Sequence, residues 1–589
     1  MGGAPAGQNQ LPRALEFWAS MAETRIIEHG GRRWSIRSEA AEPLLADGWP
    51  PDRPERLTPI KAGVRRRILR FESAGRGYYA KVYESGGPLR CLRAWLGLGP
   101  GRREWDALLA ALAAGLDVPE PVALALGPPE ALITREIAGG RRLDEYLFER
   151  YFEAGPNDPP CPGARPPELV ATFRRRRVPP EGTIDPRILA YRLASLVAQL
   201  AEADLYLPDL HPGNILIRGT PGDWRLALVD LAEAREASSD SPLEHLMQLE
   251  HFFEPLATPA ERRRCLVHLK ELLPAAPSAR EIARTTAIYR MRFYLRRDRR
   301  TRRQSKYFRR VAAGQWRGWA TADWADAVEG LFASAAGSGR RGDLFGDRAT
   351  PLKEGRTSTV WRVRLDDGRT LIAKRHNRAR PRGLLGASRS MAAFRRGHAL
   401  LVRGIPTARP AAAVDLRRAG AVVDTILMTE PVEKAQPLSE WLRSRPPAAH
   451  RRHVTWQLAR LIRRMHACGL AHRDLKAPNI LVAPAGGPNP RPVLVDLDGL
   501  VRTRHVSVRR RMQNLMRLSV SLDEWGVARE TDRLRFLRAY LAPRGCPAPI
   551  TLLTRRRGKI EAAKRLRRWW KRIARLSERK LEALRRKTP

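Results

Sequence analysis

The chain carries one local pattern twice. Residues 206–217 read YLPDLHPGNILI and residues 471–482 read AHRDLKAPNILV, so in each stretch an Asp precedes by five residues an Asn that opens a short apolar run. A strand-like segment ending in Asp follows each stretch, LALVD at 226–230 and VLVD at 493–496. Because these pieces keep their order, the sequence indicates an internal duplication.

The duplication extends in both directions. Upstream, YYAKVY at 78–83 matches LIAKR at 371–375, and each alternates apolar side chains as expected for a strand that carries one Lys. Downstream, HLMQL at 245–249 matches NLMRL at 514–518. We therefore predict an α+β fold in which each half has a small, strand-rich lobe followed by a larger, mainly helical lobe.

The length of the chain, 589 residues, is too great for one hydrophobic core. We predict a first domain at residues 1–285, a basic connector and lead-in at 286–345, and a second domain at 346–589. The first half also contains an extra segment at 155–182, whose Pro and Gly content predicts an irregular surface excursion.

Targeting and redox signals are absent from the sequence. No run of about 18 apolar residues occurs, so we expect no membrane-spanning helix. The N-terminus lacks a basic start followed by an apolar core, so we expect no secretory signal and a cytoplasmic protein. The five cysteines have no C-x-x-C spacing and are expected to be reduced thiols.

The charge of the chain is strongly basic. Lysine and arginine number 108 against 62 aspartates and glutamates, a formal net charge of +46. Such an excess favours polyanionic partners, namely nucleic acid, anionic membrane lipid or a phosphorylated substrate. The alternative is that many arginines reflect base composition and lie on solvated surface. Since no nucleic-acid recognition motif is present, we expect no specific nucleic-acid partner.

The second half has the parts that phosphoryl transfer needs, in the order in which protein-kinase-like folds present them. Lys374 lies on a predicted strand and would hold the nucleotide phosphates, while Asp474 would orient the attacking hydroxyl. Asn479 and Asp496 are the predicted metal ligands, and Lys476 would lie near the transferred phosphate.

The specificity of this motif comes from its full length. A lone D-x-x-x-x-N arises by chance in many proteins, whereas the run HRDLK at 472–476, with its Asn and a downstream strand that ends in Asp, is specific. We interpret His472 as a packing residue that supports the loop rather than as a catalytic base.

The first half has the matching residues Lys81, Asp209, Asn214 and Asp230. It also has Glu104 on the following predicted helix, placed to hold Lys81 by an ion pair. Its loop reads Leu-Pro-Asp where the second half reads His-Arg-Asp, so the supporting frame differs while the reacting groups are kept.

Neither half is complete. The position of the second half that corresponds to the helix glutamate is about Ala393, with no carboxylate nearby. The glycine-rich phosphate loop is also weak: Gly355 and Ser358 stand in KEGRTSTV, and Gly75 and Gly77 stand in SAGRGYY, but neither is a full G-x-G-x-x-G. These residues are either phosphate-loop residues or simple turns. Either half could therefore be impaired.

The chain resembles the lipopolysaccharide kinase (Kdo/WaaP) family, which shares the protein-kinase-like fold. In the first half the resemblance rests on RGYYAKVY, REWDALLAAL and the G-x-x-V-P-x-P turn. In the second half it rests on HRDLKAPNIL, on VDLDG where protein kinases have Asp-Phe-Gly, and on TDRLRFLRAYL at 531–541. The sequence DLHPGNIL at 209–216 is also similar to the corresponding loop of aminoglycoside and choline phosphotransferases.

The resemblance implies two tandem bilobal protein-kinase-like domains in a bacterial enzyme that uses ATP and Mg²⁺. It implies transfer of the γ-phosphate to a Kdo or heptose hydroxyl of the lipopolysaccharide inner core, or of a related glycolipid, at the cytoplasmic face of the membrane. One alternative is a protein Ser/Thr kinase, which HRDLK permits and the missing A-P-E motif disfavours. Another is a nucleotide-binding pseudokinase scaffold. The acceptor position, the activity of each half and the oligomeric state stay open.

One basic segment bears on the nature of the acceptor. After Asp496 the second half carries the basic residues Arg502, Arg504, His505, Arg509, Arg510 and Arg511, whereas the matching segment of the first half is mainly acidic. If these segments line the acceptor site, as the resemblance implies, the second half suits a phosphate-bearing acceptor. The alternative is a solvated surface loop.

The C-terminal stretch 555–587 is predicted to be a basic amphipathic helix. Leu566, Trp570, Ile573, Leu581 and Leu584 recur at near-helical spacing among arginines and lysines. We expect this stripe to pack on its own domain, which leaves a basic face toward an anionic membrane surface, and the alternative is that the stripe itself lies on the membrane.

Overall fold

The computed structural model describes the residues 24–29, 31–38, 44, 54–62, 66–84, 87–153, 174–176, 178–254, 256–337, 344–355, 357–376, 387–419, 421–487, 489–527, 529–542 and 556–586.

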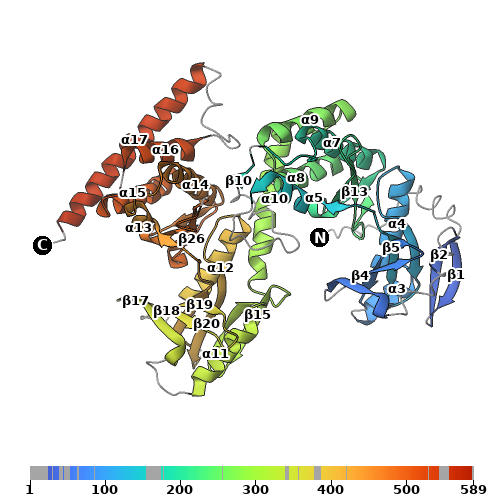
Figure 1. Ribbon diagram of the computed structural model, residues 1–589, viewed down its shortest axis with the longest axis horizontal. Coiled ribbons are helices and arrows are strands. Elements are labelled where there is room, and N and C mark those ends of the chain that lie inside the picture. The colour runs from blue at the N-terminus through green and yellow to red at the C-terminus, as the bar shows by residue number, and fades with distance from the viewer. Residues whose placement is uncertain are drawn as a thin grey trace, which may run out of the picture. The chain divides into compact units, whose positions relative to one another are not determined.

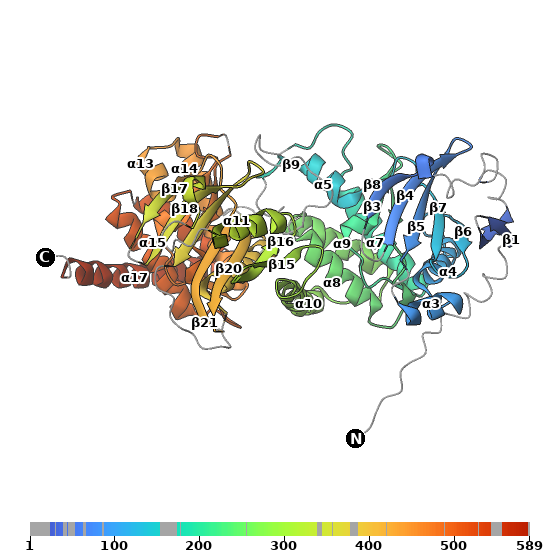
Figure 2. The same ribbon diagram turned by 90° about the horizontal axis from the view of Figure 1, so that it is seen from below.

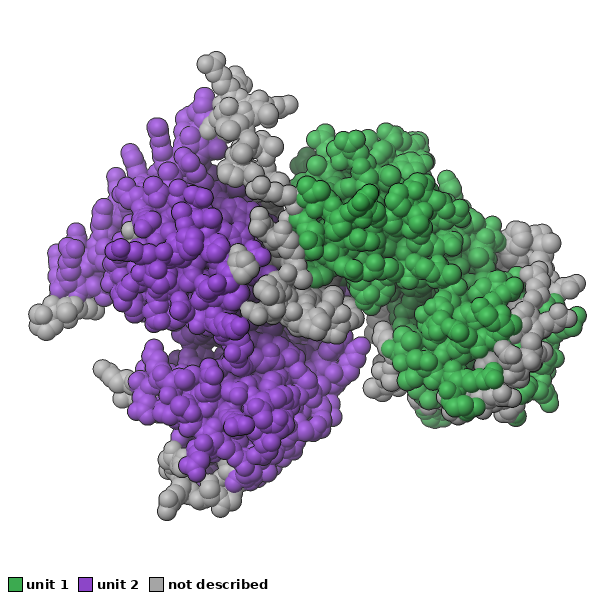
Figure 3. All heavy atoms as spheres, viewed as in Figure 1, with its two compact units in different colours: residues 1–153, 161–164, 175–290 green, residues 154–160, 165–174, 291–589 purple. Residues whose placement is uncertain are grey.

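The described residues divide into two compact units (Figure 3). The first unit contains residues 24–153 and 175–290, and the second contains residues 291–586. One long helix, α10 (Ala279–Arg300), crosses this division. Among the helices of the described ranges, none is long and apolar enough to cross a membrane.

A seven-stranded antiparallel sheet forms the small lobe of the first unit. Its strands are β1 (Thr24–His29), β2 (Arg32–Arg37), β3 (Thr58–Ala62), β4 (Arg66–Ser73), β5 (Arg76–Tyr83), β6 (Pro121–Ala125) and β7 (Ala131–Arg135). Their order across the sheet is β1-β2-β6-β7-β5-β4-β3. Two helices, α3 (Pro88–Trp95) and α4 (Pro100–Ala113), follow β5.

The second unit repeats this sheet (Figure 1). Its strands are β15 (Phe308–Ala313), β16 (Trp316–Thr321), β17 (Ala349–Glu354), β18 (Ser358–Arg364), β19 (Thr370–His376), β20 (Pro410–Arg418) and β21 (Ala421–Thr429). Their order, β15-β16-β20-β21-β19-β18-β17, matches that of the first sheet strand for strand. The predicted Lys-bearing strands are β5 and β19, which occupy the same place in the two sheets.

The strand β20 lies between two helices, which explains the apolar run Pro410–Val414 in its first half. Ala412 and Val414 belong to a buried cluster with α11 (Ala325–Gly337), while Ala413 belongs to a cluster with α12 (Arg389–Val402). Because alternate side chains of a strand point to opposite faces, a strand covered on both faces must be apolar at every position.

The helical lobes also correspond. In the first unit the helices are α5 (Leu143–Tyr151), α7 (Pro186–Glu202), α8 (Ser241–Phe253), α9 (Pro259–Leu272) and α10. In the second unit they are α13 (Leu438–Arg443), α14 (Ala448–Ala467), α15 (Val508–Glu524), α16 (Glu530–Leu541) and α17 (Arg556–Arg585). Figure 2 shows α17 as a long helix at the C-terminal end of the second unit.

Short strands connect these helices in the same way in both units. The sheet β13-β12-β8 of the first unit matches β25-β24-β22 of the second, and the pair β11-β14 matches β23-β26. The first set is β8 (Arg141–Arg142), β11 (Leu205–Tyr206), β12 (Ile215–Arg218), β13 (Arg225–Leu228) and β14 (Arg235–Glu236). The second set is β22 (Gln436–Pro437), β23 (Leu470–His472), β24 (Ile480–Ala483), β25 (Arg491–Leu494) and β26 (Leu500–Arg502).

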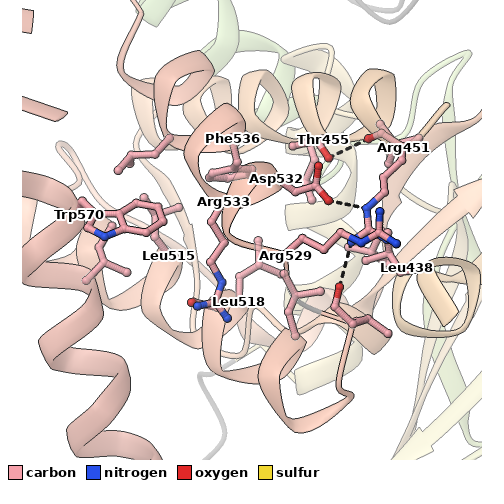
Figure 4. Close-up of a pocket in the computed structure, with 18 of the residues that line it drawn as sticks. Leu438, Arg451, Thr455, Leu515, Leu518, Arg529, Asp532, Arg533, Phe536 and Trp570 are labelled. Atoms are coloured by element: carbon pink, nitrogen blue, oxygen red, sulfur yellow. Dashed lines mark hydrogen bonds and ion pairs between the residues drawn. The ribbon is translucent and has the colours of Figure 1, made fainter. Parts of the chain in front are cut away.

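The amphipathic stripe of α17 packs on its own helical lobe. Trp569 is buried, and Leu566, Trp570 and Ile573 pack against the same core. Trp570 and Ile573 line an apolar pocket of about 120 Å³ among α13 to α17 (Figure 4). A smaller pocket of about 70 Å³ lies among α5 and α7 to α10 of the first unit. The expected packing of the stripe is thus present.

Two predicted segments need comment. The lead-in predicted at 286–345 contains β15, β16 and α11, which belong to the sheet and core of the second unit. The predicted excursion at 155–182 falls largely outside the described residues, since 155–173 and 177 are not among them.

Candidate active site

Lys374 of the second unit lies at the centre of an acidic cluster. From β19 its Nζ reaches Asp496 Oδ1 at 2.6 Å and Asp498 Oδ2 at 2.8 Å. Both carboxylates come from the turn that follows β25, where Asp496 has a left-handed backbone with φ 61°. That conformation breaks the strand and directs two successive acidic side chains back toward the sheet.

The cluster is largely buried, and its charges stabilise one another. Burial disfavours the charged form of Asp498, but contact with His376, at 3.3 Å, and with Lys374 outweighs this and lowers the pKa of the carboxyl. Burial likewise opposes the charge on Lys374, yet Asp498 and Asp496 raise its pKa. Both partners therefore stay ionised at neutral pH.

The predicted catalytic loop has a defined geometry. The Asn479 side-chain nitrogen donates to the Asp474 carbonyl oxygen at 2.9 Å and lies 3.4 Å from Asp496 Oδ2. Asp474 Oδ1 is 3.0 Å from Lys476 Nζ, and both side chains are half exposed. The loop thus brings Asp474, Asn479 and Asp496 together beside Lys374, with Asp474 and Lys476 on the solvent side.

His472 connects the loop to the turn that holds Asp496. Its Nδ1 accepts the backbone N–H of Asp474 at 3.2 Å, and its Nε2 donates to the Asp496 carbonyl at 2.9 Å. Burial lowers the pKa of this imidazole, so the neutral form that these two bonds require is favoured. Gly499 leaves room for the ring, since a Cβ there would lie 2.6 Å from His472 Cε1. Both ring nitrogens support the loop.

The helix α12 has no carboxylate facing Lys374, and it approaches the Asp496 turn closely. A Cβ on Gly397 would lie 2.4 Å from Pro410 Cγ and 2.6 Å from Leu497 Cδ1, so a larger residue would require these side chains to shift. Ala393, the position predicted to lack a glutamate, is fully buried in the core. Asp498 therefore takes the place of a helix carboxylate as the partner of Lys374.

Gly355 and Ser358 lie at the turn between β17 and β18. In the strand register Lys374 is opposite Val360, which places Ser358 two residues away on the neighbouring strand. The hairpin of the first unit that corresponds to β17-β18 is β3-β4, whose turn at 63–65 falls outside the described residues. Gly75 lies instead in the turn of the next hairpin, between β4 and β5, and Gly77 is the second residue of β5.

The first unit brings its predicted residues together in a similar frame. Lys81 forms an ion pair with Glu104, which is fully buried on α4 and also accepts the hydroxyl of Tyr83. The Asn214 side-chain nitrogen donates to the Asp209 carbonyl oxygen at 3.1 Å, as its counterpart does in the second unit. Asp230 has the same left-handed backbone as Asp496, with φ 68°.

Asp230 differs from Asp496 in its partner. Both of its carboxylate oxygens contact the guanidinium of Arg66 on β4, in a bidentate ion pair. Leu207 occupies the place of His472, and its backbone N–H donates to His245 Nε2 at 2.9 Å. Asp209 is exposed, with His211 Nε2 at 3.6 Å.

Sequence reasoning missed Asp498 and Arg66. The second acidic residue of VDLDG was a readable signal for Asp498, because two neighbouring carboxylates repel each other unless a cation lies between them. Arg66 gave no such signal, since it lies in a run of three arginines.

The basic segment after Asp496 divides into two groups. Arg502 is tied to Asp298 of α10 at 2.8 Å, and Arg511 donates to the Val506 carbonyl at 2.9 Å. The remaining residues are exposed: Arg504, His505, Arg509 and Arg510.

Comparison with known proteins places this site in a family. The model of the lipopolysaccharide kinase (Kdo/WaaP) family matches residues 339–540, within the second unit. A 3-deoxy-D-manno-octulosonic acid kinase of Xylella fastidiosa is 31% identical over 221 residues, which are 34% of this chain and 84% of that protein. A protein of the same name from Xanthomonas campestris is 35% identical over 190 residues, 30% of this chain and 71% of that protein.

Among solved structures, one titled WaaP in complex with acyl carrier protein is 24% identical, with a TM-score of 0.27, and the match covers 38% of this chain and 88% of that one. From the sequence relatives, the chain belongs to the lipopolysaccharide kinase (Kdo/WaaP) family, and it is a phosphotransferase that acts on an alcohol group.

Proposed function

We propose that the second unit transfers the γ-phosphate of ATP to a sugar hydroxyl of the lipopolysaccharide inner core, or of a related glycolipid, at the cytoplasmic face of the membrane. The observation that carries the proposal is the pairing of Lys374 with Asp496 beside the loop of Asp474 and Asn479. We favour Kdo over heptose as the acceptor, because the relatives above are named 3-deoxy-D-manno-octulosonic acid kinases.

The residues of the second unit fit a divalent metal that arrives with the nucleotide. Within the described residues, no group of three His, Cys, Asp or Glu side chains could hold a metal ion. Asp496 offers a carboxylate, and Asn479 turns its amide nitrogen to the loop backbone, which leaves its oxygen for coordination. Mg²⁺ binds with one or two such ligands plus nucleotide phosphates, and would there neutralise phosphate charge.

Each remaining residue has a role in the proposed transfer. Lys374 exchanges its contact with Asp496 for the nucleotide phosphates, while Asp498 keeps its ammonium group in place. Asp474 accepts a hydrogen bond from the acceptor hydroxyl and orients its oxygen toward the phosphorus. Lys476 stabilises the charge on the transferred group, and Gly355 and Ser358 cover the phosphates from the β17-β18 turn.

We further propose that the first unit is a second copy of the kinase-like domain. The matching strand order of the two sheets and the shared loop geometry of Asn214 and Asn479 support this reading. We propose that the first domain ends near residue 290 and that the second includes β15, β16 and α11 of the predicted lead-in, because these elements belong to the second sheet and its core.

A peripheral position at an anionic membrane is part of the proposal. The stripe of α17 is buried against the helical lobe, so the basic side chains on its other face are the ones available to lipid headgroups. Arg568, Lys571, Arg572 and Arg575 are all exposed.

The experiment is a transfer assay with labelled ATP. The purified chain is incubated with Mg²⁺ and lipopolysaccharide that carries unphosphorylated Kdo, with lipopolysaccharide in which that hydroxyl is blocked, with a generic protein, or with no acceptor. Label on the first acceptor only supports the proposal. Label on the generic protein would favour the protein kinase alternative, and label nowhere, with nucleotide still bound, would favour a pseudokinase scaffold.

A further inference from the structure

Arg66 of the first unit occupies the position that Ser358 occupies in the second. In the sheet register Lys81 is opposite Ile68, and Arg66 lies two residues before Ile68 on β4. Lys374 is likewise opposite Val360, and Ser358 lies two residues before it on β18. A long cation thus stands in the first unit where the second has a small hydroxyl.

The guanidinium of Arg66 uses both oxygens of Asp230. The two parallel contacts form the bidentate geometry in which arginine binds a carboxylate most strongly. Each side chain keeps only about a quarter of its surface exposed (25% and 26%), so water screens the pair weakly. Both oxygens of Asp230 are engaged, whereas Lys374 contacts only Oδ1 of Asp496, so Mg²⁺ at Asp230 would have to displace the guanidinium and these residues do not fit a metal.

The local charges of the two sites also indicate that the second site needs a metal and the first does not. Lys374 faces two carboxylates, so the second site needs further cations before it accepts a triphosphate. In the first site Lys81 pairs with Glu104 and Arg66 pairs with Asp230, and Ala232 stands where the second site has Asp498. Each of these carboxylates in the first site is therefore neutralised by a side-chain cation without a metal.

We propose that the first unit binds the phosphates of a nucleotide without a divalent metal, with Arg66 in the place of the ion and Lys81 as the second cation. This inference rests on the proposed kinase-like nature of the first unit, and it assigns that unit to nucleotide binding rather than transfer. It replaces the metal-binding role expected for Asp230 and Asn214.

The test is binding of a fluorescent ATP analogue to the full chain, with Asp496→Ala introduced to impair the second site. We expect binding to persist in EDTA with an affinity within about threefold of that in Mg²⁺. Adding Arg66→Ser, the residue of the second unit, should weaken binding in EDTA by at least about tenfold, and Mg²⁺ should then restore part of it because Asp230 is released. The control is Arg67→Ser, whose side chain pairs with Glu84.

Two outcomes would overturn the inference: no binding in EDTA while Arg66 is intact, or unchanged EDTA binding after Arg66→Ser. Neither depends on the acceptor, because no transfer is measured. Failure of the lipopolysaccharide assay above would leave this result untouched, so the two proposals fail separately.

A second, independent observation concerns α3. None of its residues is buried, and its apolar side chains are unusually exposed: Leu89 is 77% exposed, Leu92 53% and Trp95 78%. Leu96 and Leu98 extend this apolar surface beyond the helix end. Contiguous exposed leucine and tryptophan on an amphipathic helix are typical of an interaction surface.

The surrounding charges indicate the kind of partner. Between residues 85 and 103 the sequence has no acidic residue, while it has four arginines: Arg90, Arg93, Arg102 and Arg103. Apolar side chains beside arginines complement an anionic bilayer, in which tryptophan and leucine enter the headgroup boundary and arginine contacts phosphate. We infer that α3 is a membrane-docking helix, which rests on the proposed membrane location and names a specific contact for it.

The test is flotation of the full chain with vesicles of phosphatidylethanolamine and phosphatidylglycerol, without nucleotide or glycolipid. The double variant Leu92→Asp and Trp95→Asp should lose at least about tenfold in partitioning, whereas Val267→Asp, an exposed position on α9, should not. Equal flotation of the double variant would overturn the inference, even if the chain binds vesicles through another surface. A change in oligomeric state without a change in flotation would also overturn it, in favour of a second copy as the occupant.

Discussion

Lys374 Nζ lies 2.8 Å from Asp498 Oδ2, and this pair does in the second unit what the pair of Lys81 and Glu104 does in the first. The lysine is held by the turn after β25 rather than by the helix that follows the lysine strand. Because that turn also carries Asp496, the position of the lysine and the direction of Asp496 are set by one local structure.

The first prediction is that Asp498→Ala weakens binding of Mg²⁺-ATP to the second unit by roughly 10- to 100-fold. Without Asp498, Lys374 has only Asp496 as a partner, and the ion pair competes with the metal for that carboxylate. Titration calorimetry of the full chain in Mg²⁺ measures this. The matched control is Asp424→Ala, which breaks the 2.7 Å pair with Arg375, the next residue on β19. Equal affinity in the two variants would contradict the role of Asp498.

The second prediction separates the two units by their hydroxyl-orienting residues. Asp474→Asn should lower the turnover number by about 10²- to 10⁴-fold and leave nucleotide binding nearly unchanged, because the amide keeps the shape but not the basicity of the carboxylate. Asp209→Asn should leave turnover within about twofold. The transfer assay gives both values. If Asp209→Asn is the variant that loses activity, the first unit performs the chemistry.

Local spacing was enough to predict the loops. In both units the Asn side chain donates to the carbonyl of the Asp five residues earlier, at 3.1 Å for Asn214 and 2.9 Å for Asn479. This contact joins residues only five apart in the chain, so it can be predicted from local sequence alone. The amphipathic stripe of α17 was predictable for the same reason, because helical periodicity is local.

The ion pair of Lys81 with Glu104 was predicted, but the partners of Arg66 and Lys374 were not predictable from the sequence. Arg66 and Asp230 are 164 residues apart, and Lys374 and Asp496 are 122 apart, so only the assembled sheet and turn bring them together. The hairpin β15-β16 was hidden for another reason. Its arginines made 297–310 look like a connector, although the turn at Gly314, with φ 54°, marks a hairpin.

The third prediction concerns pH and His466. This buried imidazole donates from Nε2 to Asn514 Oδ1 at 3.0 Å and accepts the Tyr540 hydroxyl at Nδ1, 2.8 Å away. The bond at Nδ1 needs the neutral ring, because a protonated Nδ1 cannot accept a hydrogen bond. Burial lowers its pKa to about 4. The unfolded chain takes up the proton first as the pH falls, so the free energy of unfolding should decrease between pH 7 and pH 5, by about 2 kcal/mol from this residue.

The measurement for His466 is hydrogen exchange of the amides in α14 and α15, corrected for the intrinsic pH dependence of exchange. His466→Gln should flatten the fall in local stability between pH 7 and pH 5, since the amide does not titrate. The exposed His505→Gln should leave the fall unchanged. A variant curve parallel to that of the parent chain would mean that His466 is already protonated in the folded state.

The last prediction tests the basic face of α17 without disturbing its packing. Arg568, Lys571 and Arg575 are exposed, while the apolar side of the helix is held in the core by Trp569, so reversing these three charges should leave the helical lobe folded. Each cation near an anionic leaflet contributes about 1 kcal/mol at low salt, and the triple change to Glu should lower partitioning onto phosphatidylglycerol vesicles by at least about tenfold.

The control for this triple change has the same net charge. Lys353, Arg362 and Arg364 are exposed on β17 and β18, and their change to Glu alters the overall field equally but not the face of α17. If both triple variants lose binding to the same extent, the net charge of the chain drives association and α17 has no special part. If only the α17 variant loses vesicle binding, and if high salt abolishes vesicle binding of the parent chain, this helix is the electrostatic contact. High salt has this effect because screening removes the attraction of exposed charges beyond a Debye length.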